Sequence, residues 1–189
     1  MRTPQQKRLP KALSDEECRR LIGAVRILTY RACFATMYGC GLRIGEAITL
    51  RSKQIDKHRG VIQVIGKGNR ERLVPLPATL LDGLRNAWRT HGNREWVFAR
   101  NATNGPINRE SLYRAFRAAR KDANLPEATP HLFRHSYATR LLENGIRAEV
   151  VRILLGHASI RTTQTYLHLT EPTRVELQKV VGSIMRDLC

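Results

Sequence analysis

The sequence lacks the features that mark a secreted or membrane protein. No apolar run approaches the ~20 residues needed to span a bilayer, and the basic start contains no apolar signal segment. Its four cysteines are irregularly spaced without a CxxC pair, which argues against a zinc ribbon and against a disulfide framework. We therefore expect a soluble cytoplasmic protein with reduced thiols.

Aromatic and acidic residues are also scarce. Aromatics make up 6% of the chain without an RNP-like cluster, which weighs against proteins that stack single-stranded bases. The 33 lysines and arginines outnumber 16 acidic residues and leave a net charge of +17. Because cationic side chains gain affinity by displacing counterions from phosphates, this excess predicts a nucleic-acid partner. A basic domain bound to a ribosome or a membrane surface is the alternative.

Periodicity predicts a mainly α fold with a small antiparallel β-sheet (α+β), preceded by a basic arm or interdomain linker over residues 1–13. Ser14 and Glu17 form a capping box that begins the first helix. Two β-prone runs, residues 61–65 and 72–76, flank a Gly-Lys-Gly-Asn tip and predict a hairpin.

The other predicted elements are helices with recognisable ends. A helix over residues 28–38 stops at Gly39-Cys40-Gly41, where the backbone turns sharply and presents Arg43 before a short helix. Asn108 caps another helix, with Leu112, Phe116 and Ala119 on one face. The helix that Pro130 opens has an expected buried stripe of Leu132, Tyr137, Leu141 and Leu142, and stops at Gly145.

Two familiar motifs are incomplete in this chain. His131 and His135 lie four residues apart, as in a zinc peptidase, but Leu132 stands where that motif has its glutamate. Gly66-Lys67-Gly68 lacks the first glycine and the serine or threonine of a phosphate-binding P-loop. We therefore expect no metal and no nucleotide cofactor.

Taken singly, the remaining candidates have ordinary explanations. Tyr166 beside leucines is typical of a packing residue, and Arg43 with Glu46 is typical of an ion pair within a helix. Lys67 at a turn is typical of a solvated side chain. A functional interpretation must rest on these residues jointly.

Jointly, four separated segments resemble the signature of the tyrosine recombinases of the phage-integrase family. They are GLRIGE with Arg43, GKGNRER with Lys67, HLFRH with His131 and Arg134, and LLGHASIRTTQTYLH with His157 and Tyr166. The spacings of three residues from His131 to Arg134 and nine from His157 to Tyr166 also match. The resemblance implies the catalytic-domain fold of DNA breaking-rejoining enzymes over residues 14–170, and site-specific recombination of double-stranded DNA.

The chemistry suits the residues that the resemblance assigns to it. Arg43 and Arg134 can bind the nonbridging oxygens of a phosphodiester bidentately and stay charged. Tyr166 is the expected nucleophile, whose hydroxyl must lose its proton as a 3′-phosphotyrosyl bond forms. Energy kept in that bond allows religation without ATP or a metal ion.

The resemblance assigns proton transfer to three further residues. Lys67 is the expected general acid for the departing 5′-oxygen. His131 is suited to proton shuttling, and His157 to hydrogen bonding a nonbridging oxygen. With these roles filled, we expect His135 in the core or just behind the site, and Glu46 as a structural orienter of Arg43.

The resemblance also bears on partners and organisation. Family members work as a synaptic tetramer on DNA, and a C-terminal helix, here in residues 171–189, often docks on a neighbouring protomer. Val175, Val180, Ile184 and Leu188 form its expected apolar face, for which packing on its own domain is the alternative. The smaller helical domain that usually precedes the catalytic domain has no room in this chain, which is then part of a longer protein or naturally short. A bacterial or phage-derived protein at the nucleoid is expected.

Three other functions compete with this hypothesis. A type IB topoisomerase uses similar catalytic groups, but the GLRIGE and LLGHASIRTTQTY segments resemble recombinases. A catalytically silent DNA-binding protein would be favoured by a replaced catalytic position, and all six expected residues are in place. A structural or RNA-binding protein explains the charge but not the four segments.

Overall fold

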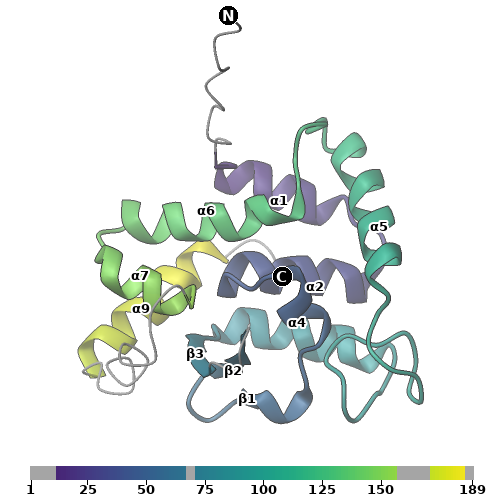
Figure 1. Cartoon of the computed structure of the whole chain (residues 1–189), viewed down its shortest axis with the longest axis horizontal. Coiled ribbons are helices and arrows are strands. Elements are labelled where there is room, and N and C mark those ends of the chain that lie inside the picture. Colours follow the sequence, from purple (N-terminus) through teal and green to yellow (C-terminus); the bar gives the residue numbers. More distant parts are fainter. Residues whose placement is uncertain (1–11, 67–70, 157–170, 186–189) are drawn as a thin grey trace, which may run out of the picture.

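The computed structural model describes residues 12–66, 71–156 and 171–185 (Figure 1). The helices are α1 (Asp15–Gly23), α2 (Leu28–Cys40), α3 (Ile44–Ile48), α4 (Ala78–Arg89), α5 (Arg109–Asp122), α6 (Pro130–Glu143), α7 (Ala148–Leu154) and α9 (Glu171–Ile184). The strands are β1 (Ile55–Asp56), β2 (Val61–Ile65) and β3 (Glu71–Pro75), after a 3₁₀ turn at Ser52–Gln54. The expected mainly helical fold with a small antiparallel sheet is confirmed.

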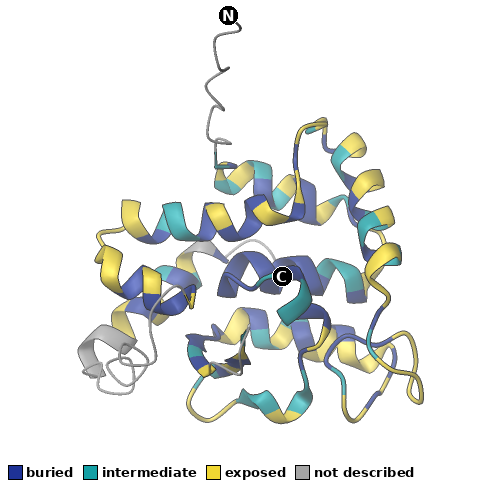
Figure 2. Cartoon of the chain, in the orientation of Figure 1, coloured by how far each residue is buried: buried dark blue, intermediate teal, exposed yellow. Residues whose placement is uncertain are grey.

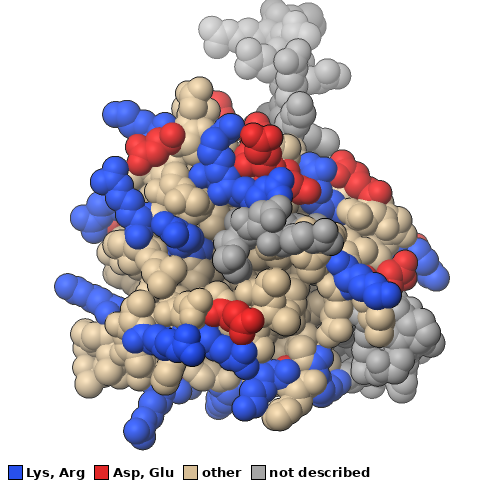
Figure 3. All heavy atoms as spheres, turned by 180° about the vertical axis from the view of Figure 1, so that it is seen from behind, with Lys and Arg blue, Asp and Glu red and all other residues tan. Residues whose placement is uncertain are grey.

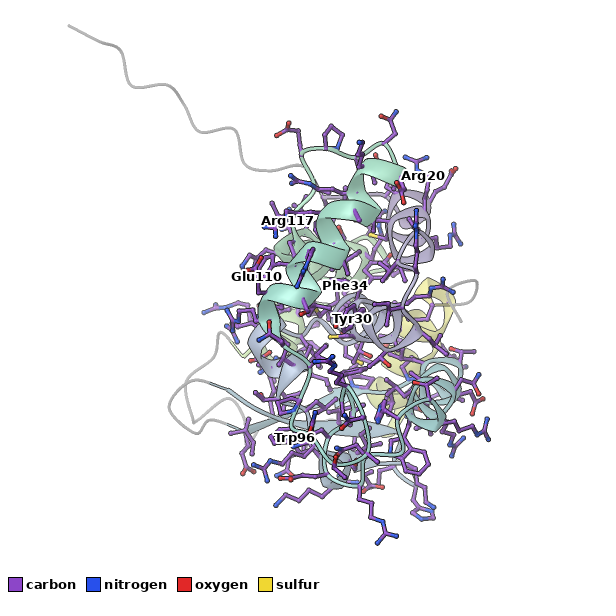
Figure 4. All side chains as sticks on the ribbon, turned by 90° about the vertical axis from the view of Figure 1, so that its right-hand side faces the viewer. Arg20, Tyr30, Phe34, Trp96, Glu110 and Arg117 are labelled. Carbon is purple, nitrogen blue, oxygen red and sulfur yellow. The ribbon has the colours of Figure 1, made fainter. Side chains whose placement is uncertain are left out.

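Helix α2 is the centre of the molecule. Ten of its 13 residues are buried, as expected for a helix without a polar face (Figure 2). Helices α1 and α6 cover one side of it, and α4 and the sheet lie on the other (Figure 1). Phe34 of α2, labelled in Figure 4, contacts Phe116 and Phe133 at ring-centroid distances of 5.4 and 5.7 Å, which packs α5 and α6 onto α2. The core thereby fixes the start of α6, where part of the site lies.

The predicted capping box begins α1. The Glu17 amide donates to Ser14 Oγ, and the Ser14 amide donates to the Glu17 carboxylate, at 3.1 and 2.7 Å. Leu13, which the sequence analysis assigned to the arm, is buried, and its amide donates to Ser136 Oγ of α6 at 2.9 Å. Leu13 is therefore part of the packed core and not of the arm.

The predicted hairpin is present, and a third strand extends it. Strands β2 and β3 pair antiparallel with Val61 opposite Pro75 and Val64 opposite Arg72. The short β1 pairs with β2 on the other side, so the sheet order is β1-β2-β3. Alternation buries Ile62 and Val64 on β2, together with Arg72 and Val74 on β3. An arginine thus occupies the inner face of the hairpin.

Two expected apolar faces need correction. On α6, Leu132, Tyr137 and Leu141 are buried as predicted, whereas Leu142 is 49% exposed because it lies one residue past the buried stripe.

Among the described side chains of α9 and the residue after it, Leu177, Val181 and Met185 are buried, whereas the expected apolar face began at Val175. Val175 is exposed, Val180 is half-buried, and the side chains of Ile184 and Leu188 lie outside the described ones. This face is the buried one because Met185 packs directly over Gly39, where a Cβ would lie 2.6 Å from the Met185 sulfur. In this structure α9 packs on its own domain, against α2, α6 and β3.

Candidate active site

Among the expected catalytic residues that the structure describes, Arg134 is the most deeply buried. It lies on the second turn of α6, which Pro130 starts, and it is only 9% exposed. Its Nη1 donates to the Gly41 carbonyl at 2.6 Å, and its Nη2 donates to the Leu155 carbonyl. Burial, followed by the nearby charges of Arg43 and Arg72, lowers the pKa of Arg134 to about 10. The guanidinium therefore stays charged at neutral pH.

Arg43 follows the sharp turn that ends α2. Gly41 adopts a left-handed conformation (φ 60°), and Arg43 is the N-cap residue of α3. The Arg43 side chain remains 39% exposed, and its Nη1 donates to Glu46 Oε1 at 2.9 Å. Because Arg134 binds the Gly41 carbonyl, the same turn joins both expected arginines at one site.

Glu46 and Arg72 form an ion pair beneath Arg43. The Arg72 Nη1 and Nη2 atoms donate to Glu46 Oε1 and Oε2 at 2.9 and 2.8 Å, with both side chains less than a tenth exposed. Burial alone would raise the pKa of Glu46, but Arg72 and Arg43 lower it to about 2. Glu46 is therefore ionised, and its expected contact with Arg43 is confirmed.

A site role for Arg72 was not among the expectations from the sequence. The signal that would have found it is strand alternation, which places Arg72 on the same inner face as Val74. A buried arginine needs an acceptor, and the acidic residue of the neighbouring GLRIGE segment supplies one.

The C-terminal end of α7 contacts both buried arginines. Arg72 Nε donates to the Leu154 carbonyl at 2.7 Å, and Arg134 binds the next carbonyl, that of Leu155. Gly156 follows with φ 66°, and a Cβ there would lie 3.2 Å from Arg72 Nη1. The chain leading to residue 157 therefore departs directly from this arginine cluster.

Both histidines of the HLFRH segment are exposed. His131 lies one turn before Arg134 on α6, and its side chain is exposed. His135 was expected in the core or just behind the site, and its exposure shows that the core alternative is wrong. The i+4 spacing puts it on the solvent side with His131, while Leu132 and Phe133 take the buried positions.

The other three expected catalytic residues, Lys67, His157 and Tyr166, lie outside the described residues. Described residues near Lys67 and His157 reach the cluster, because Arg72 is part of it and Gly156 lies against Arg72. Glu71 and Arg72 follow the hairpin tip that contains Lys67, and Gly156 precedes His157. In the described part of the chain, no three histidine, cysteine or acidic side chains gather as a metal site would require.

Three guanidinium groups and one carboxylate meet at this site. Arg43, Arg72 and Arg134 against Glu46 leave two positive charges uncompensated among these groups. Preorganised guanidinium groups in a partly desolvated site stabilise negative charge on phosphoryl oxygens. The arrangement is suited to hold a phosphodiester through Arg43 and Arg134.

Comparison with known proteins agrees with this chemistry. The profile of the phage integrase family matches residues 11–172. The chain belongs to the phage integrase family. The tyrosine recombinase XerD of Halalkalibacterium halodurans is 34% identical over 178 residues, which cover 87% of this chain and 59% of XerD.

Solved structures of recombinases share the fold of this phage integrase family member. The XerA recombinase superposes with a TM-score of 0.69 at 28% identity, over 92% of this chain and 66% of XerA. The XerH site-specific recombinase bound to its difH substrate gives a TM-score of 0.67 at 24% identity, over 90% of this chain and 54% of XerH. The chain spans only 53 to 65% of the lengths of the curated relatives that it matches.

Proposed function

We propose that this chain is the catalytic domain of a site-specific tyrosine recombinase. The observation that carries the proposal is the buried Arg134 beside the half-exposed Arg43, in a member of the phage integrase family. In the proposed reaction the Tyr166 oxygen attacks phosphorus, the tyrosine loses its proton, and the 5′-oxygen leaves. Arg43 and Arg134 bind the nonbridging oxygens while charge builds on them.

The proton transfers belong to residues that the family motif supplies. Lys67 gives a proton to the departing 5′-oxygen, and His131 shuttles the proton of Tyr166. His157 hydrogen-bonds a nonbridging oxygen. Attack by a 5′-hydroxyl of a partner strand then reverses the step, breaks the phosphotyrosyl bond and releases Tyr166, without ATP or a metal ion.

The partner in this proposal is double-stranded DNA, bound by protomers that assemble into a synaptic tetramer. The net charge of +17 and the recombinase relatives support a DNA partner. In this proposal residues 14–170 make up the catalytic domain together with Leu13, which packs on α6, and the residues before Leu13 serve as an arm or interdomain linker. Residues 171–189 form the segment proposed to exchange between protomers, and the cytoplasm of a bacterium is the proposed location. None of the helices described is long and apolar enough to cross a bilayer.

Trapping of a covalent protein–DNA adduct tests the proposal. Nicked duplexes that lose a short strand after cleavage should give an adduct on denaturing gels, unchanged by EDTA and absent with Tyr166→Phe. Tyr113→Phe, on α5, is the matched control and should form the adduct normally. An adduct that requires Mg²⁺, or one that persists in Tyr166→Phe, would contradict the mechanism.

A further inference from the structure

Arg72 is an arginine whose hydrogen-bonding capacity is used inside the protein. Its three guanidinium nitrogens donate to the Glu46 carboxylate and the Leu154 carbonyl at 2.7 to 2.9 Å. The side chain is 4% exposed, and Gly156 lies against it. The Glu46 carboxylate already lies across the Nη1 and Nη2 atoms that a phosphate would contact, and the side chain is buried, so Arg72 is not placed to bind the substrate directly.

Glu46 connects Arg72 to Arg43, which does face solvent. Its Oε1 accepts from both arginines at 2.9 Å, and its Oε2 accepts the Arg43 amide at 2.8 Å. Among the described residues, Glu46 is the acceptor found for the Arg43 guanidinium, so the remaining Arg43 N–H groups can turn to a ligand. The carboxylate thus orients Arg43 with one hydrogen bond to its guanidinium.

An orienting carboxylate has an electrostatic disadvantage at a phosphate site. Paired with Arg43 alone, Glu46 would cancel the positive charge that the phosphoryl oxygens need, and it would repel them directly. Arg72 compensates this negative charge from the buried side, through a two-point contact. The pair Glu46–Arg72 is then close to neutral, and the charge of Arg43 is retained for the substrate.

We propose that Arg72 is a positioning and charge-balancing residue, which lets Glu46 orient Arg43 without neutralising it. The inference rests on the proposed function, because the retained charge is the one that binds the scissile phosphate. It also explains why an arginine occupies the inner face of β3, where Val64 stands opposite and Val74 follows on the same face.

The test compares two substrates that differ in charge at the scissile position. A methylphosphonate replaces one nonbridging oxygen by a methyl group and removes the negative charge. Arg72→Gln should slow single-turnover adduct formation about 100-fold on the phosphate at saturating DNA, the size expected for losing one preorganised charge contact. On the methylphosphonate, Arg72→Gln should form the adduct only a few-fold more slowly than the unaltered chain does.

Control variants separate charge balance from general damage to the fold. Val74→Ala removes buried volume from the same strand without changing charge. It should slow adduct formation by the same factor on both substrates. Adding Glu46→Gln to Arg72→Gln removes the uncompensated carboxylate and should recover at least tenfold on the phosphate. Arg72→Lys keeps the charge, so its rate of adduct formation on the phosphate should fall less than that of Arg72→Gln. The lysine variant also allows the test if the glutamine variant does not fold.

Equal losses of Arg72→Gln on the two substrates would overturn the inference and leave the proposed function standing. Equal losses for Arg72→Lys and Arg72→Gln on the phosphate would overturn it too. If the unaltered chain forms no adduct on the phosphate substrate, the proposed function fails and this inference fails with it.

Discussion

Glu46 shows how a single buried carboxylate organises this site. It accepts from the Arg72 guanidinium at two points, from the Arg43 guanidinium and from the Arg43 amide. A buried charge is tolerated only when it is paired and hydrogen-bonded. Removing one partner leaves the other charge buried and unpaired, with its desolvation cost no longer offset. Stability and site geometry therefore depend on the same group.

This dependence predicts a pH signature for Glu46. Its pKa is about 2 in the fold against an ordinary 4.5, so its contribution is complete above pH 4.5 and is lost as pH falls toward 2. A shift of this size corresponds to about 3 kcal/mol. Glu46→Gln should lower the free energy of unfolding at pH 7 by about this amount. In urea titrations, the free energy of unfolding of this variant should also fall less steeply between pH 4.5 and 2 than that of the unaltered chain.

Glu149→Gln is the matched control, because Glu149 is an exposed carboxylate paired with Arg147. It should leave both the stability and its pH dependence nearly unchanged. Unchanged stability of Glu46→Gln together with lost adduct formation would show that the carboxylate acts in the chemistry and not as a structural orienter.

At the scale of elements, the turn between α2 and α3 controls the relation of two arginines. Gly41 ends α2 in a left-handed conformation, its carbonyl accepts from Arg134, and Arg43 follows two residues later. The buried ring of Tyr137 packs so close that a Cβ on Gly41 would lie 2.5 Å from it. Backbone conformation and packing both require glycine here.

Gly41→Ala should therefore destabilise the fold by about 3 kcal/mol, since left-handed strain adds to overpacking against Tyr137. Adduct formation should also slow, because the turn carries Arg43 and the acceptor of Arg134. Thermal unfolding and single-turnover assays measure the two effects. Gly23→Ala, where nothing lies within 4 Å of the new Cβ, is the control and should be neutral or slightly stabilising. Equal behaviour of the two variants would contradict this account of the turn.

At the scale of the whole molecule, positive charge is spread widely over the surface. Figure 3 shows lysines and arginines over much of the face seen from behind, with fewer acidic residues among them. Helix α5 adds exposed Arg114, Arg117 and Lys121, where Arg117 pairs with Glu110 at 2.7 Å (Figure 4). A surface of this kind attracts DNA through its phosphates before any base is contacted.

The affinity for duplex DNA should accordingly fall steeply with salt. If about six phosphates are neutralised, raising the salt from 50 to 200 mM should weaken binding roughly 10³-fold, measured by fluorescence anisotropy. Arg114→Gln on α5 should reduce the salt slope by about one if that helix contacts the backbone. Arg85→Gln, in an exposed pair with Asp82 on α4, provides a matched comparison. Affinity that does not change with salt would rule out phosphate-driven binding.

Much of the fold was predictable, and so were Arg43, Glu46 and Arg134 among the four charged groups of the described site, because their signals are local. The capping box at Ser14 needs only residues up to Glu17, and the hairpin needs only alternation around a glycine tip. The turn at Gly41 needs only backbone sterics. The roles proposed for Arg43 and Arg134 come from a motif whose chemistry is carried by residue type and spacing.

Only the tertiary structure decided which distant groups meet. Arg72 reaches Glu46 from 26 residues away and Leu154 from 82, so no local pattern reveals that these three share one site. The buried face of α9 was decided by the space over Gly39, and the exposure of His135 by the way α6 packs on α2. Amino-acid sequence by itself determined the helices, the hairpin and the family chemistry, because these depend on neighbours along the chain. Long-range packing decided the charge balance around Arg43, because it depends on which side chains the fold brings together.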